Sequence, residues 1–142
     1  MFTLTPVSAA ISTTNHTYQT AGTYSAVLTV TDNQGATHST TLSITVSPGP
    51  TPPVAPSNLS ASTSSGRVVT LSWSDNASNE TGFYVERAVK ATNLQFSRIA
   101  TVGADVKTFA KTETADTWVY RVQAFNGVGA SGYSNNVTIR VH

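Results

Sequence analysis

The last quarter of the chain alternates inward and outward residues in a way that strongly favours a pair of β-strands. Four residues of the run 118–126 fall at every second position and share one face of an extended strand: Trp118, Tyr120, Val122 and Ala124. A glycine-rich link follows at 127–132, and the alternation returns at Val137, Ile139 and Val141. The pattern predicts the closing hairpin of an antiparallel sheet.

Composition excludes several classes of protein. The chain has 142 residues, enough for one large domain or two small ones, and no cysteine, so no disulfide framework or thiolate site is expected. A net charge of +1 gives no basic footprint, and no nucleic-acid partner is expected. No stretch reaches the roughly 18 apolar residues of a membrane-spanning helix, so no membrane span is expected.

The N-terminal third predicts a hairpin. From Gly22 the sequence alternates, with one face given by Tyr24, Ala26, Leu28 and Val30. The run 32–35 (Asp-Asn-Gln-Gly) is typical of a turn, and a returning strand follows at 42–46. A further short strand is expected at 2–5.

Three motifs of this segment carry a family resemblance: His16-Thr17-Tyr18, Ala21-Gly22-Thr23-Tyr24 and the run Leu28–Gly35. Together they resemble the second half of a PKD domain, an immunoglobulin-like sandwich common on exported bacterial proteins. The resemblance covers about residues 15–46, and the family's first strands and its acidic aromatic segment have no counterpart here. It implies a partial PKD-like β-hairpin unit over residues 1–47.

A hairpin of this kind leaves its inner face exposed, and an isolated hairpin is marginal in water. Three explanations stay open: the domain begins upstream of this chain, another chain completes the hairpin by strand addition, or the hairpin packs on the second domain. Residues 1–20 lack the pattern of a signal peptide, so an export signal is expected upstream.

A proline-rich stretch separates the hairpin from the rest. Residues 47–56 hold five of the six prolines, which favours extended polyproline II structure. We interpret 48–56 as a semi-rigid linker between domains 1–47 and 57–142.

The segment 57–142 predicts seven short strands, the signature of a β-sandwich. Its motifs resemble those of a bacterial fibronectin type III domain: Leu71-Ser72-Trp73, Gly82–Arg87, Phe96–Ala100, Tyr120–Asn126 and Gly129–Asn135. The resemblance implies an all-β, immunoglobulin-like antiparallel sandwich. Trp118 stands where the family usually has its corner tyrosine, and the preceding loop 111–116 lacks the usual apolar plug. The indole N–H is expected to reach a backbone carbonyl instead.

Catalytic and metal-binding patterns are missing from the sequence. His16, His38 and His142 are not in a ligand spacing, and no Gly-x-Ser-x-Gly elbow occurs. A small filled sandwich also offers no cleft for a pair of catalytic carboxylates. We therefore expect no enzyme activity, no cofactor and no metal site, although the oxygen-rich loop 75–80 leaves calcium binding open.

The aromatic residues divide into a core set and a surface set. The predicted core consists of Trp73, Phe83, Val85, Trp118, Tyr120 and Val122. The predicted binding surface, out of phase with the core, consists of Tyr84, Arg121, Phe125 and Tyr133.

These inferences predict a non-catalytic accessory module of a larger exported bacterial protein, extracellular or at the cell surface. It would serve as a spacer or a weak binding unit, with other domains of its parent protein and a polysaccharide or protein as partners. The alternative is a structural or adhesive surface protein that self-associates through the N-terminal hairpin by strand complementation, with filaments as one outcome.

Overall fold

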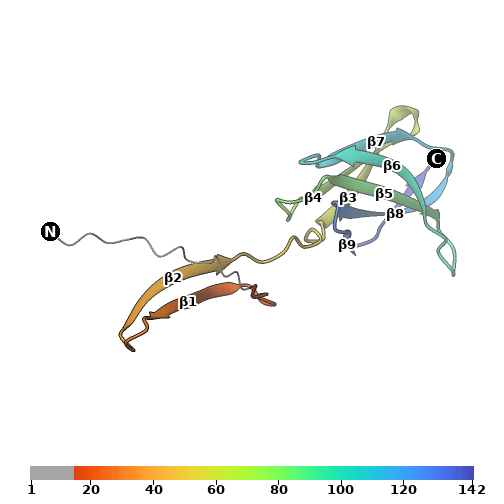
Figure 1. Cartoon of the computed structure of the whole chain (residues 1–142). Helices are drawn as coiled ribbons and strands as arrows, with labels where there is room; N and C mark the ends of the chain where they lie inside the picture. Colours follow the sequence, from red (N-terminus) through yellow and green to blue (C-terminus); the bar gives the residue numbers. More distant parts are fainter. Residues whose placement is uncertain (1–14) are drawn as a thin grey trace. The chain divides into compact units, whose positions relative to one another are not determined.

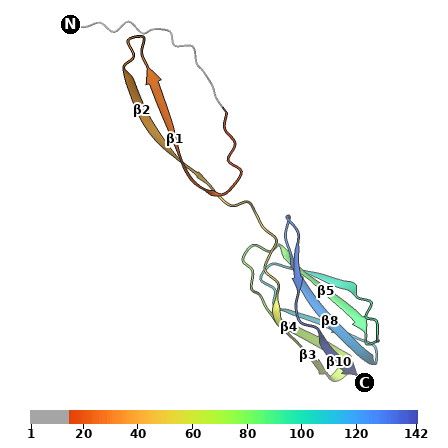
Figure 2. The same ribbon diagram turned by 90° about the horizontal axis from the view of Figure 1, so that it is seen from below.

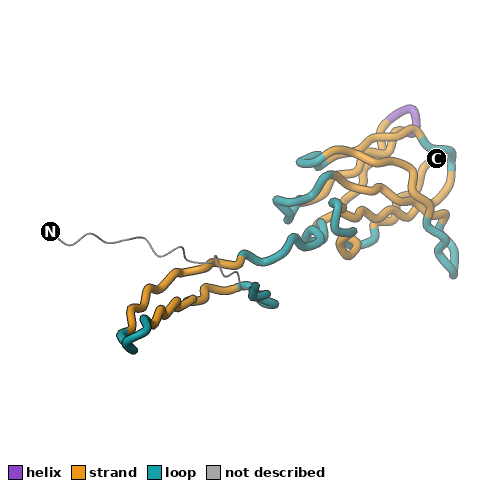
Figure 3. The backbone as a smooth tube through the Cα atoms, in the orientation of Figure 1, coloured by secondary structure: helices purple, strands orange, loops and turns teal. Residues whose placement is uncertain are grey.

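The computed structural model describes residues 15–142, so the strand expected at 2–5 lies outside the described residues. The chain divides into two compact units, Met1–Gly49 and Pro50–His142, which are described separately below (Figure 1). Strands account for most of the described residues, together with one 3-10 turn at Ser65–Arg67 (Figure 3). The predicted all-β class is confirmed.

The first unit contains the predicted hairpin. Strand β1 (Gly22–Thr31) pairs antiparallel with β2 (Thr37–Val46) without a break in register. The Asp32 carboxylate accepts hydrogen bonds from the backbone N–H groups of Gln34 and Ala36, at 2.9 and 2.8 Å. Gly35 adopts a φ of 86°, which is easy only for a residue without Cβ. The turn therefore closes as its Asp and Gly residues predict.

The second unit is a sandwich of two antiparallel sheets (Figures 1 and 2). The three-stranded sheet has the order β3-β4-β7, with bounds Ser57–Ser64, Val68–Ser74 and Thr108–Thr112. The five-stranded sheet has the order β10-β8-β5-β6, with β9 also paired to β8. Its strands are β5 (Gly82–Val89), β6 (Ser97–Gly103), β8 (Asp116–Phe125), β9 (Ala130–Tyr133) and β10 (Val137–Val141).

The predicted glycine-rich link at 127–132 is wrong in part, because a further short strand, β9, begins within it ahead of the predicted last strand, β10. Both β9 and β10 pair with β8, at opposite ends of it. The break falls at Ser134–Asn136, where Asn135 turns away to bond the backbone of Leu59 on β3, donating to its C=O and accepting from its N–H, both at 2.9 Å. Asn135 thus joins the two sheets, and the strand that pairs with β8 is interrupted at this point.

The core lies between the sheets. All six predicted core residues are buried: Trp73, Phe83, Val85, Trp118, Tyr120 and Val122. Leu59, Val69 and Leu71 of the three-stranded sheet complete the cluster with Ala124 and Val141. Trp73 and Phe83 bring the sheets into contact, with ring centroids 5.6 Å apart.

Part of the predicted linker belongs to the sandwich. The carbonyl of Thr51 accepts hydrogen bonds from the amides of Asn79 and Asn126, at 3.0 and 2.9 Å. The Asn76 amide bonds the carbonyl of Ala55 at 2.9 Å, and Pro53 is buried. The unit therefore begins at Pro50 rather than at residue 57. The proline-rich segment has few backbone N–H groups, and the asparagine amides instead donate hydrogen bonds to its carbonyls.

A substitution at Gly82 tests the close packing of β5 against β6. A Cβ at Gly82 would lie 2.2 Å from the Val102 carbonyl oxygen and 3.2 Å from the Phe125 ring. We therefore expect Gly82→Ala to lower the free energy of unfolding by about 3 kcal/mol, because strands β5 and β6 would have to separate. Urea denaturation measures the change.

The matched control for this substitution is Gly103→Ala. Gly103 lies directly opposite Gly82 in the register, and a Cβ there would meet nothing within 4 Å. Its effect is expected to stay within about 0.5 kcal/mol. Equal effects of the two substitutions would contradict the close approach.

Candidate functional site

The outer face of the five-stranded sheet carries the predicted binding surface. Tyr84 of β5 stacks on Phe125 of β8, with ring centroids 4.1 Å apart and ring planes 4° from parallel. Tyr84 is half-buried, because Phe125 covers one face of its ring. Phe125 lies two positions along β8 from Gln123, the residue opposite Tyr84, a diagonal within reach of large side chains on neighbouring strands.

A β-bulge places an arginine beside this stack. Val85 pairs with Ala100 but Glu86 pairs with Arg98, so Ile99 is an extra residue on β6. The bulge inverts the alternation, so that Ile99 packs on the core and Arg98 points to the outer face. The Arg98 guanidinium lies 3.2 Å from the centroid of the Tyr84 ring. Period-two reasoning missed this residue, because the bulge leaves no mark in the sequence.

A second stack forms around Arg121. Its guanidinium lies 3.5 Å from the ring centroid of Tyr133 and 4.0 Å from that of Phe96. It also forms an ion pair of 2.7 Å with Glu86, which is 8 % exposed. The structure therefore brings all four predicted surface residues to one face and adds Phe96, Arg98 and Glu86 to them.

These contacts limit what the face can do. Phe125 covers one face of the Tyr84 ring and Arg98 covers the other. Neither face of the Tyr84 ring is therefore free to stack on a ligand. Tyr133 is 43 % exposed, although Arg121 lies over its ring. Among the charged groups of this face, Glu86 and Arg121 neutralise one another. Arg98 is exposed and forms no ion pair within residues 15–142.

The corner of the sandwich contains a buried polar network. The Trp118 indole N–H donates to the carbonyl of Thr114 at 3.1 Å, as the sequence suggests. In the place of an apolar plug stands Glu113, which is 5 % exposed. Its carboxylate accepts hydrogen bonds from the Tyr120 hydroxyl, at 2.9 Å, and from the Arg87 guanidinium. Arg87 in turn lies 3.9 Å from the centre of the Trp118 ring.

This network shifts the titration of Tyr120. Burial raises the pKa of the Tyr120 hydroxyl far above its usual range, and the hydrogen bond to Glu113 and the charge of that carboxylate add to the rise. The folded protein therefore keeps this tyrosine protonated at a pH where the unfolded chain releases the proton. The network is structural, since its charged members are saturated by one another.

A pH series tests the network. The unfolded chain loses the Tyr120 proton above about pH 10 and the folded chain does not, so rising pH favours unfolding by up to about 1.4 kcal/mol per unit. Tyr120→Phe should be less stable at pH 8 by about 1–3 kcal/mol, because Glu113 loses a donor. The difference in stability between the wild type and Tyr120→Phe should become smaller above pH 10, because only the wild type loses stability through Tyr120 there. Denaturant unfolding at several pH values measures it, and parallel stability curves would contradict the assignment.

Three carboxylates meet at the opposite end of the sheet. Asp75, Glu80 and Asp105 can each place an oxygen within 4.8 Å of the others. The predicted oxygen-rich loop thus gains a member from the β6–β7 turn, where Asp105 has a φ of 59°. One Glu80 oxygen accepts a long bond of 3.4 Å from the Asp105 N–H. Asp75 and Glu80 are half-buried, and the other Glu80 oxygen is buried without a hydrogen-bond partner among the described residues. We assign no metal site to the cluster.

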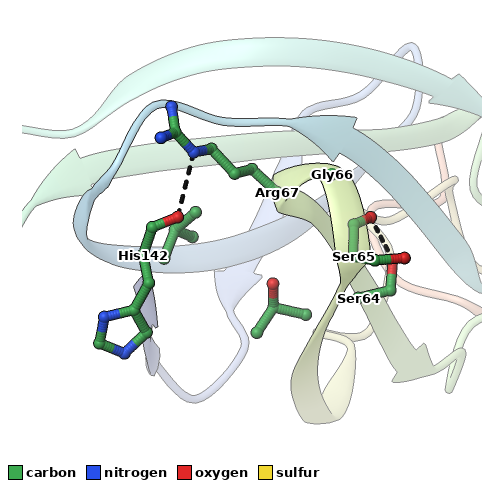
Figure 4. Close-up of a pocket in the computed structure, with 7 residues that line it drawn as sticks. Ser64, Ser65, Gly66, Arg67 and His142 are labelled. Atoms are coloured by element: carbon green, nitrogen blue, oxygen red, sulfur yellow. Dashed lines mark hydrogen bonds between the residues drawn. The ribbon is translucent and has the colours of Figure 1, made fainter.

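A pocket of about 420 Å³ lies at the end of the sandwich that carries the C-terminal strand (Figure 4). Small polar residues of 63–66 line it, and the Arg67 Nε–H donates to the His142 carbonyl at 3.0 Å. This pocket contains no pair of groups arranged for acid–base chemistry.

The three histidines lie on different elements. His16 lies edge-on to Tyr18, His38 is on β2, and His142 follows β10.

The fold and these contacts define a class of protein, a two-part all-β chain whose C-terminal unit is an immunoglobulin-like sandwich. The family model of the PKD domain matches residues 7–46. No curated protein matches the sequence of the chain.

Solved structures identify the fold of the sandwich. An Fn3-like protein from Clostridium thermocellum is 24 % identical, with a TM-score of 0.53 over 62 % of this chain and 92 % of that one. A fibronectin type-III domain of human fibronectin type III domain containing protein 3 is 18 % identical, with a TM-score of 0.54 over 68 % and 92 %. Pectate lyase PelI from Erwinia chrysanthemi is 28 % identical, with a TM-score of 0.50 over 56 % of this chain and 26 % of the lyase.

The chain is thus a PKD-like segment followed by a domain with the fibronectin type III fold. Domains of both kinds are typically accessory extracellular modules. Over residues 15–142, no helix is long and apolar enough to cross a membrane.

Proposed function

We propose that the chain is a non-catalytic accessory part of a larger exported bacterial protein, in which the sandwich acts as a spacer and a weak binding unit. The observation that carries the proposal is that the two buried carboxylates of the sandwich, Glu86 and Glu113, are both paired with arginines. Glu113 is held by Arg87 and Tyr120 at the corner, and Glu86 is held by Arg121 on the outer face. Groups that are saturated in this way build a scaffold and are not free to act as acids, bases or nucleophiles.

The likeness to part of a pectate lyase supports an enzyme-associated setting. The matched region is 26 % of that lyase, so the likeness extends to a part of the protein and does not carry its activity over. The proposed partners are therefore other domains of the parent protein and a polysaccharide outside the cell.

The clamped segment 51–56 supports the role of a spacer. Because asparagine amides hold Thr51 and Ala55 on the sandwich, only the few residues between Val46 and Thr51 link the hairpin to it without such bonds. The sandwich therefore contains its own entry segment and should fold without help from the chain before it.

Insertion of a flexible Gly-Ser segment tests this modularity. Placed between Gly49 and Pro50 of the full chain, it should leave the Tm of the sandwich unchanged, because no described hydrogen bond of the sandwich is interrupted. The same segment placed between Val54 and Ala55 should lower the Tm by about 5 °C or more, since it separates Thr51 from its asparagines. Scanning calorimetry measures both.

Equal losses of Tm from the two insertions would contradict a self-contained module.

An activity assay tests whether the chain is non-catalytic. The purified chain should release no reducing ends from polysaccharides and no peptides from casein. Turnover that copurifies with the chain would overturn the non-catalytic function.

The hairpin favours a second candidate function, that of a structural or adhesive protein whose subunits pair. Three of its apolar side chains are more than half exposed on one face: Leu28, Val30 and Leu42. Within the described residues, β1 and β2 pair only with each other, and neither strand carries a Lys, Arg, Asp or Glu. Charged side chains are a common device against edge pairing, and their absence supports self-association.

Sedimentation separates this candidate from the first. A pairing hairpin should assemble with rising concentration, and Leu42→Ser should shift the chain toward monomer, because Leu42 lies on the apolar face. Val27→Ser is the control, since Val27 is equally exposed, at 62 %, but faces the Thr- and Ser-coated side. A monomer at the highest soluble concentration would exclude pairing.

A further inference from the structure

The outer face of the five-stranded sheet contains an arginine that is held in position without being neutralised. Arg98 lies on β6, at the edge of the sheet, and its guanidinium rests on the Tyr84 ring. It is exposed, and within the described residues it has no hydrogen bond and no acidic partner. A guanidinium fixed flat on a ring keeps its N–H groups available at its rim, in the fork that matches a carboxylate.

Tyr133 lies at the other edge of this face, on β9. Arg121 holds its ring from within the sheet, while 43 % of the residue remains exposed. A ring oriented in this way can pack against the C–H face of a sugar, because aromatic side chains combine apolar area with a polar tip. Strand spacing of about 4.8 Å separates β6 from β9 by roughly 14 Å across β5 and β8. A ligand that reaches both residues therefore runs across the strands.

The charges around the face favour an anion at the Arg98 end. Lys90, in the loop between β5 and β6, lies at the same end of β5 as Arg98. The three carboxylates of Asp75, Glu80 and Asp105 lie at the other end, beyond the Gly82–Gly103 pair. Four residues of strand, roughly 13 Å, separate the Gly82 and Glu86 rows. Within the described residues, Arg98 forms no ion pair, so it is the group of this face that is available to attract a negative group.

We propose that this face binds an anionic polysaccharide, a uronate-bearing chain whose carboxylate binds Arg98 and whose sugar ring packs on Tyr133. The inference deepens the proposed weak binding function and rests on it. An acidic protein segment would use Arg98 as well, but it gains nothing specific from the open tyrosine ring. Tyr84 and Phe125 hold the arginine in place and do not contact the ligand.

Affinity electrophoresis and calorimetry with the full chain test the proposal. Polygalacturonate is the probe, dextran is the uncharged polymer, and poly-L-glutamate is the acidic peptide. We expect binding to polygalacturonate alone. Arg98→Gln should weaken it about tenfold, because a charge-assisted hydrogen bond is lost. Arg98→Lys should restore little, since an ammonium keeps the charge but not the planar fork.

Substitutions of Tyr133 provide the second part of the test. Tyr133→Ala should weaken binding several-fold, whereas Tyr133→Phe should retain it because the ring remains. Lys111→Gln is the matched charge control, because it removes one exposed positive charge from β7 of the other sheet. Its affinity should stay within about twofold of the wild type. The Tm of each variant shows that it is folded.

Two results would overturn the inference. One is no binding to polygalacturonate by the wild type, which leaves the spacer function intact because that function is tested by the inserted segments. The other is equal binding of poly-L-glutamate with no effect of Tyr133→Ala, which would make the face an ionic patch for acidic proteins.

Discussion

The central strand β8 is the constraint on which the sandwich depends. It pairs with β5 on one side and with β9 and β10 on the other, so it has no free edge. Its alternation assigns Tyr120 and Val122 to the core and Arg121 and Phe125 to the outer face. A shift of one residue in its register would exchange the two sets and bury an arginine in the core. The core and the candidate binding face are therefore specified by one short stretch of sequence.

The buried carboxylate of Glu113 shows how this chain departs, at the corner, from the fibronectin type III domains that it resembles. A charge in such a position is tolerated only when it is paired and hydrogen-bonded. Arg87 reaches it from β5 and Tyr120 from β8, while Trp118 provides a ring beneath the arginine. The unusual tryptophan and the missing apolar plug are thus two parts of one arrangement: the larger ring supports the cation that allows the acid to be buried.

Sequence reasoning succeeded where the side-chain period is regular. The hairpin at 22–46 and the inward set on β8 follow from alternation alone. It missed Arg98, because a bulge shifts the phase of β6 by one residue, and Glu113, because its partners are 7 and 26 residues away. It also set the boundary at 57 and left the clamped segment in the linker, since the asparagines that hold Thr51 are distant in the chain. Such contacts depend on tertiary structure and have no local pattern.

The stacking on the outer face changes which residues are worth testing. The alternation of the sequence predicted four surface residues without distinguishing their roles. Their contacts in the structure separate supporting residues from residues that are open to a ligand. Tyr84, Phe125 and Arg121 are occupied by one another or by Arg98 and Glu86, so removing them would disturb the support as well as any ligand contact. Arg98 and Tyr133 keep exposed groups that the same contacts orient. A ligand that meets groups already fixed pays less conformational entropy on binding. The saturated contacts that argue against catalysis therefore favour a rigid, shallow binding face.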